Sequence, residues 1–145
     1  MRITPDTGIL VRMNAKAAGP ARSLLEHVLA GPHELVLSEF LLNETARVLR
    51  YPRMHQLYKL TSEEIAEHIQ LLRARAEIVS PIIYKPVVLA DPDDDPLVYT
   101  AVTGQADVLC AVDRDFYAAD VISFCQERGI AIMNDVALLR KLRTS

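Results

Sequence analysis

Val108-Leu109-Cys110-Ala111-Val112 is an unbroken apolar run that ends at Asp113-Arg114-Asp115. Five successive apolar residues without polar alternation are typical of a strand buried on both faces, as in a parallel sheet covered by helices. The acids that follow would then stand at the carboxyl end of a central strand. In open α/β sheets this end lines the ligand crevice, so we expect the functional groups there.

Outward from this run, short apolar segments alternate with amphipathic helical patterns. We expect further strands or extended segments near Ile3 and at 35–37, 78–79, 87–89 and 130–133, and helices at 17–29, 38–50, 61–76, 96–102, 117–127 and 136–142. Such alternation predicts an α/β sandwich with a largely parallel central sheet.

Length and composition indicate one globular domain spanning residues 1–145. The chain is 50% hydrophobic and 24% charged, with a formal net charge of −3. It can therefore bury a core, and it does not bind nucleic acid through overall positive charge, so any such contact must be local. No apolar run reaches the roughly 18 residues of a membrane span. We expect a cytoplasmic protein without membrane association, in which Cys110 and Cys125 are buried, reduced thiols.

The aspartates are unevenly placed, since seven of the ten lie between Asp91 and Asp115. Asp6 follows the first expected strand, Asp94 opens a helix and Asp113 follows the central strand, so the three can meet in space. Converging carboxylates require a compensating positive charge. Mg²⁺ supplies it together with phosphate oxygens, which points to metal-assisted phosphate chemistry.

Four segments carrying these acids resemble the PIN-domain nucleases, and more closely their toxin-like (VapC-like) branch in toxin–antitoxin systems. Asp6-Thr7-Gly8-Ile9-Leu10-Val11 is similar to the family's opening Asp-Thr-Asn-x-Leu-Val, and Leu41-Leu42-Asn43-Glu44-Thr45-Ala46-Arg47-Val48-Leu49 to its acid-bearing helix. Asp91-Pro92-Asp93-Asp94-Asp95 is similar to its acidic helix start, and Asp113-Arg114-Asp115-Phe116 to its closing Asp-x-Asp-hydrophobic element. Their order along the chain matches the family's order.

The resemblance implies a PIN-like three-layer α/β/α sandwich with a short, largely parallel central sheet. It implies an endoribonuclease in which Asp6, Glu44, Asp94 and Asp113 form the catalytic carboxylate cluster, with Asp115 as a further member. Asp6, Asp94 and Asp113 would hold Mg²⁺ or Mn²⁺. It further implies an RNA substrate, a cognate antitoxin protein and a homodimer.

The register within the acidic loop is open, because Asp91, Asp93, Asp94 and Asp95 are all available. Asp94 is favoured because Leu97, Val98 and Ala101 then fall three, four and seven residues after it, on one helix face. Asp95 is the alternative.

Two positions depart from the family pattern. Gly8 replaces the usual Asn after Asp-Thr, and Ala111 replaces a Ser or Thr two residues before Asp113. Lost supporting groups around a metal site can cost 10–100-fold in affinity or activity. The alternative hypothesis is therefore a PIN-fold RNA-binding or protein-binding regulatory module with weakened catalysis. A protein that does not bind Mn²⁺ would favour this alternative. A response-regulator-like acidic pocket fits the position of Glu44 poorly.

Each acid also has an ordinary structural interpretation. Asp94 or Asp95 could cap a helix, and the acids after the central strand could form a solvated turn. Glu44 could be an exposed residue paired with Arg47. Burial of Glu44 would distinguish the two interpretations.

Other features have less specific interpretations. The histidines lack zinc-binding spacing. A basic and aromatic stretch, Arg47, Arg50, Tyr51, Arg53, His55 and Tyr58, could contact a phosphate backbone and bases, or be a solvated helix end. The apolar face of Ile65, Ile69, Leu72 and Ala76 belongs either to the core or to a dimer or partner groove.

Overall fold

The structure, a computed structural model, describes residues 1–144 and contains one five-stranded sheet. The strands are β1 (Arg2–Pro5), β2 (Glu34–Leu37), β3 (Ala76–Ile78), β4 (Val108–Cys110) and β5 (Ala131–Met133). Their order is β3-β2-β1-β4-β5, and all neighbouring strands are parallel. The expected parallel α/β architecture is confirmed.

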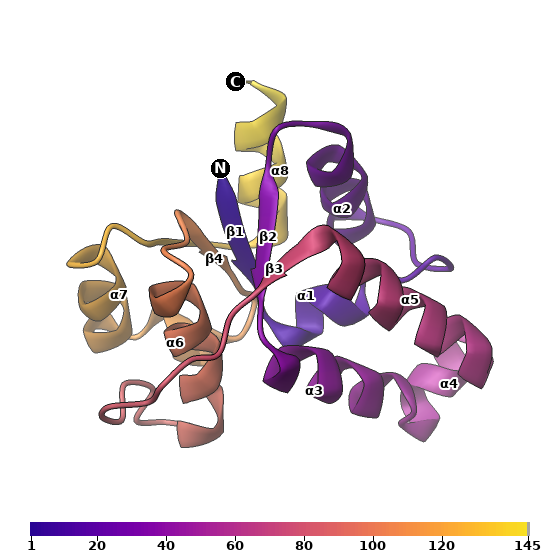
Figure 1. The fold of residues 1–145 in the computed structure, drawn as a ribbon, viewed down its shortest axis with the longest axis horizontal. Helices are drawn as coiled ribbons and strands as arrows, with labels where there is room; N and C mark the ends of the chain where they lie inside the picture. The colour runs from indigo at the N-terminus through magenta and orange to yellow at the C-terminus, as the bar shows by residue number, and fades with distance from the viewer. Residues whose placement is uncertain (145) are drawn as a thin grey trace.

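Helices cover both faces of this sheet. They are α1 (Thr7–Val11), α2 (Pro20–Ala30), α3 (Glu39–Leu49), α4 (Pro52–Tyr58), α5 (Ser62–Arg75), α6 (Asp95–Thr103), α7 (Ala119–Gln126) and α8 (Asp135–Arg143), with 3₁₀ helices η1 (Pro92–Asp94) and η2 (Arg114–Tyr117). Figure 1 shows α6 and α7 on one side of the sheet and α1, α2, α3 and α5 on the other. The result is the expected three-layer α/β/α sandwich.

The central strands are buried as the apolar run predicts. Every residue of β4 is buried, but the strand ends at Cys110, earlier than expected. Val112 leaves the sheet because its backbone N–H donates to the Asp6 carboxylate, 3.3 Å away, and its side chain is 43% exposed. Helix α6 closes tightly over the sheet at Gly104, where an added Cβ would lie 2.1 Å from Cγ1 of Val36.

Two parts of the chain differ from a simple alternation of strands and helices. Residues 87–89 form no strand, because the N–H groups of Val87 and Val88 donate to the carboxylate of Asp95 instead of a neighbouring strand. The expected elements include no helix between residues 50 and 61, but α4 lies there and begins at Pro52. Proline is favoured at that position because its missing N–H needs no intrahelical partner.

Helix α5 places its apolar residues in the core. Ile65, Ile69 and Leu72 are buried, which confirms the core interpretation of that face. Cys110 and Cys125 are free and buried, and burial raises the pKa of the Cys125 thiol to about 11. Among the described residues, no helix has the length and apolar character of a membrane span.

Candidate active site

Strands β1 and β4 lie side by side at the centre of the sheet, and the connections that follow them leave in opposite directions. This is the point where strand order reverses, which is where open α/β sheets bind their ligands. Asp6 follows β1 directly, and Asp113 lies three residues after β4. Their positions agree with the expectation that acids gather at the carboxyl ends of these strands.

Asp6 is held rigidly by backbone groups from both strands' ends. Its Oδ1 accepts from the N–H of Ile9 at 2.7 Å and caps α1, while its Oδ2 accepts from the N–H of Val112. Burial, with a smaller contribution from the charge of Asp113, raises the pKa of this carboxyl to about 6, against the lowering effect of the two N–H groups and Arg12. Asp6 is therefore a preorganised carboxylate whose charge is only partly compensated.

Asp94, the last residue of η1, is the least satisfied acid. Its Oδ2 is buried and has no hydrogen-bond partner among residues 1–144. Burial, followed by the charges of Asp91, Asp113, Glu44 and Asp115, raises its pKa to about 7. A buried carboxylate oxygen surrounded by like charges lacks the cation that would stabilise it.

Glu44 lies on α3 and is partly buried, its side chain 23% exposed. The hydroxyl of Thr7 donates to its Oε1, and Arg47 lies 3.7 Å from its Oε2. The helix-surface pair with Arg47 therefore exists, but the carboxylate also contacts α1. Thr7 is a supporting residue that the sequence analysis did not assign, although it follows Asp6 directly.

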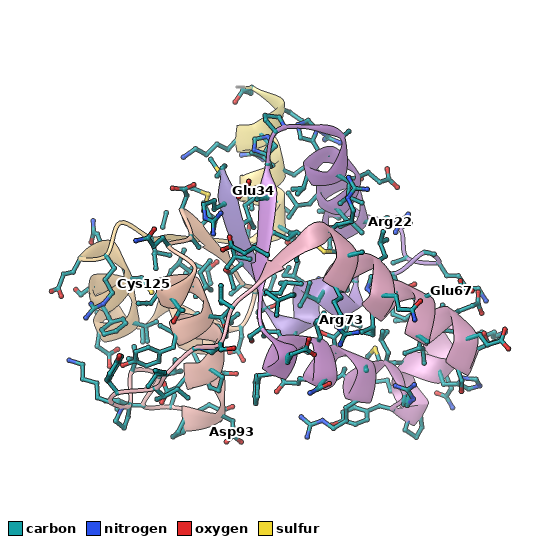
Figure 2. The ribbon with its side chains drawn as sticks, in the orientation of Figure 1. Arg22, Glu34, Glu67, Arg73, Asp93 and Cys125 are labelled. Carbon is teal, nitrogen blue, oxygen red and sulfur yellow. The ribbon has the colours of Figure 1, made fainter. Side chains whose placement is uncertain are left out.

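A cavity of about 390 Å³ connects these groups. It is lined by Asp6, Thr7, Gly8, Phe40, Leu41, Glu44, Asp93, Asp94, Leu97, Val112, Asp113 and Phe116. The structure thus brings Asp6, Glu44, Asp94 and Asp113 together, and no Lys, Arg or His is among the described residues that line the cavity. Asp93 lies on η1, directly before α6, and is labelled at the lower edge of Figure 2.

Asp115 lies apart from this lining. Its N–H donates to Oδ1 of Asp113 at 2.9 Å, and its carboxylate groups with Asp91 and Asp94, with one oxygen from each acid within 4.8 Å of the others. Asp94 is thus common to both sets of acids. The sequence analysis did not place Asp91 in a cluster, because only the folded loop brings it beside Asp115.

The donor set fits a hard divalent cation. All candidate ligands are carboxylate oxygens, which Mg²⁺ and Mn²⁺ prefer, and residues 1–144 place neither imidazole nor thiolate in the cavity lining. The Oδ2 of Asp94 supplies an oxygen that no group of the described residues satisfies. Asp94 contributes to the cavity lining beside Asp6 and Asp113 and also to the group with Asp91 and Asp115, which is the described set of three acids whose oxygens lie within 4.8 Å of one another.

Comparison with known proteins agrees with this arrangement. Neither a search of curated proteins nor a search of solved structures found a match to the chain. A model of the PIN domain family, in contrast, matches residues 2–115 and so includes β1, α3, the acidic loop and Asp113. Because that match spans well over half of the sequence, the chain belongs to the PIN domain family.

Proposed function

We propose that this protein is a Mg²⁺- or Mn²⁺-dependent endoribonuclease that hydrolyses RNA phosphodiester bonds at the cavity between α1, α3 and the start of α6. The observation that carries the proposal is the buried Oδ2 of Asp94, which has no partner among residues 1–144, in a cavity that these residues line with five carboxylates and no cationic side chain. Membership of the PIN domain family supports it, because PIN domains are generally nucleases that use divalent metal ions.

Asp6, Asp94 and Asp113 would hold the ion, and Glu44 and Asp115 would complete the acidic surroundings. A bound divalent cation supplies a water of lowered pKa and neutralises charge that develops on the phosphodiester. The chain itself orients two of these acids: Ile9 and Val112 donate to Asp6, and Thr7 donates to Glu44. Preorganised carboxylates need no reorganisation when substrate arrives, which is a condition for efficient electrostatic catalysis.

The toxin role is a finer proposal that rests on the sequence resemblance. In this proposal the protein acts in the cytoplasm as the toxin of a toxin–antitoxin system, is inhibited by a cognate antitoxin protein and forms a homodimer. Sedimentation at micromolar concentration tests the dimer, and a single species with the mass of one chain would contradict it.

A PIN-fold binding module with weakened catalysis is the second candidate. Gly8 favours it, because a Cβ at this position would lie 3.5 Å from Oδ1 of Asp6. A side chain there would reach the acids, and this chain provides none.

The test is cleavage of a panel of single-stranded RNAs with Mg²⁺, with Mn²⁺ and with chelator. Wild type is compared with Asp6→Asn and with Asp120→Asn, the same change at an exposed acid outside the cavity. The proposal expects metal-dependent cleavage by wild type and Asp120→Asn and its loss in Asp6→Asn. Equal cleavage by all three proteins would contradict it, and RNA binding without cleavage would favour the binding module.

A further inference from the structure

A second, larger cavity of about 780 Å³ adjoins the carboxylate cavity. The two share the lining residues Phe40, Glu44, Asp93 and Asp94. The volume of the second cavity falls within the roughly 300–1,000 Å³ typical of small-molecule sites. One ligand in the second cavity would therefore extend to a phosphate bound at the acids of the carboxylate cavity.

The walls of the second cavity combine apolar and polar groups. Phe40 and Val48 on α3 and Ile83 on the loop before η1 form an apolar part. Phe40 and Ile83 are 41% and 47% exposed, so solvent reaches apolar groups that line a hollow. Asn43 and Arg47 add an amide and a guanidinium beside them.

Helix periodicity links this wall to the candidate active site. Phe40 precedes Glu44 by four residues and Val48 follows it by four, so one stripe of α3 carries an aromatic ring, a carboxylate and an apolar contact. A ligand with a flat apolar face on one side and a phosphate on the other matches that order. A nucleotide has this form.

Charge decides which part of a nucleotide enters the second cavity. Asp91 and Asp93 lie on its lining, whereas Arg47 is the only cation among the described residues that do so. Acids exclude a phosphate from this space but not an uncharged base. Arg47 is 65% exposed and only 3.7 Å from Glu44, so it can turn to a neighbouring phosphate at little cost.

We infer that the second cavity binds an unpaired nucleobase of the strand whose phosphate lies at the carboxylate cluster, with the ring of Phe40 stacked on the base and Asn43 facing the base edge. The inference rests on the proposed function and deepens it, because a base can enter such a cavity only when it is not paired. Aromatic stacking tolerates every base, so the cavity selects strandedness more than sequence.

The first part of the test is binding of a short single-stranded RNA and its duplex in Ca²⁺, measured by fluorescence anisotropy. Phe40→Ala is expected to weaken single-strand binding by roughly 5-fold to 100-fold, the range of one base–aromatic stack. Phe40→Tyr retains the ring and should bind within about 3-fold of wild type. Ile122→Ala, at an exposed apolar residue on α7 outside both cavities, should bind as wild type does. Duplex binding should be weak and insensitive to Phe40.

The second part uses RNAs with a single abasic nucleotide moved along the strand. At one position the missing base should weaken binding to wild type and to Phe40→Tyr but not to Phe40→Ala. The reason is that removing the base and removing the ring eliminate the same stacking contact. Losses that simply add, or a Phe40→Ala variant that binds like wild type while melting normally, would overturn the inference. Cleavage that persists without any dependence on Phe40 would overturn it and leave the proposed function standing. Base-dependent binding without metal-dependent cleavage would overturn the proposed function and leave the base-binding cavity standing.

Discussion

Asp94 and Asp95 are adjacent in the chain, yet their carboxylates serve different parts of the molecule. Oδ1 of Asp95 accepts from the N–H groups of Val87 and Val88 at 3.0 and 2.8 Å, and the residue is only 4% exposed. Asp94 lines both cavities and leaves Oδ2 without a partner among the described residues. One acid secures the loop before α6, and the other is free to bind a ligand.

This division predicts opposite effects on stability. Asp95→Ala should lower the free energy of unfolding by roughly 1–3 kcal/mol, because it leaves buried N–H groups unsatisfied. Asp94→Asn should leave stability unchanged or raise it in metal-free buffer at pH 8, because it removes a charge from a cluster of like charges. Urea unfolding of both variants measures this. The reverse order would show that Asp95 is the ligand and Asp94 the structural acid.

Divalent metal should stabilise the folded protein through the carboxylate cavity. At Mn²⁺ about 100 times the Kd, mass action adds about 2.7 kcal/mol. For a chain of this length, each kcal/mol of added stability raises the Tm by roughly 2–4 °C. Thermal unfolding with and without Mn²⁺ should show this rise in wild type and Asp120→Asn. An equal rise in Asp6→Asn and Asp94→Asn would place the ion elsewhere.

His68 should make the fold acid-sensitive. The ring is 5% exposed, its Nε2 lies 2.9 Å from the carbonyl oxygen of Leu10, and burial lowers its pKa below 6.5. The unfolded chain then binds the proton more tightly than the folded chain, so stability is full above about pH 6.5 and falls as pH decreases through the lowered folded pKa. Unfolding free energies across this range should lose that part of their pH dependence in His68→Gln. An unchanged pH profile would mean that the ring is not buried in its neutral form.

Gly8 should be replaceable at a gain in stability. It lies in α1, and an added Cβ would meet Oδ1 of Asp6 at an ordinary contact distance of 3.5 Å. Gly8→Ala should raise the free energy of unfolding by roughly 0.5–1 kcal/mol through helix propensity. Gly8→Asn, which restores the side chain usual in the family, should in addition tighten Mn²⁺ binding measured by calorimetry. If Ala and Asn have the same effect on Mn²⁺ affinity, the amide supports no acid here.

Much of the fold was predictable because local patterns and tertiary contacts agree. The run at 108–112 predicted a buried strand followed by acids, and β4 and Asp113 lie there. The run at 87–89 was expected as a strand or extended segment, but it joins no strand, because the carboxylate of Asp95 accepts from the backbone N–H groups that a sheet would use. No apolar pattern reports such a side-chain acceptor.

Part of the candidate site could also be predicted from the sequence, and part could not. Asp6 and Asp113 follow strands, so topology alone predicts that they approach each other. The grouping of Asp91 with Asp115 and the place of Phe40 between two cavities depend on how the acidic loop folds back onto α3 and η2. That packing joins residues distant in sequence and carries no local pattern.

The most direct measurement is anomalous X-ray diffraction from crystals grown with Mn²⁺. The proposed nuclease site predicts a manganese peak between the carboxylates of Asp6, Asp94 and Asp113, and its loss in Asp6→Asn. A peak only among Asp91, Asp94 and Asp115, or no peak at a Mn²⁺ concentration that supports RNA cleavage, would contradict it.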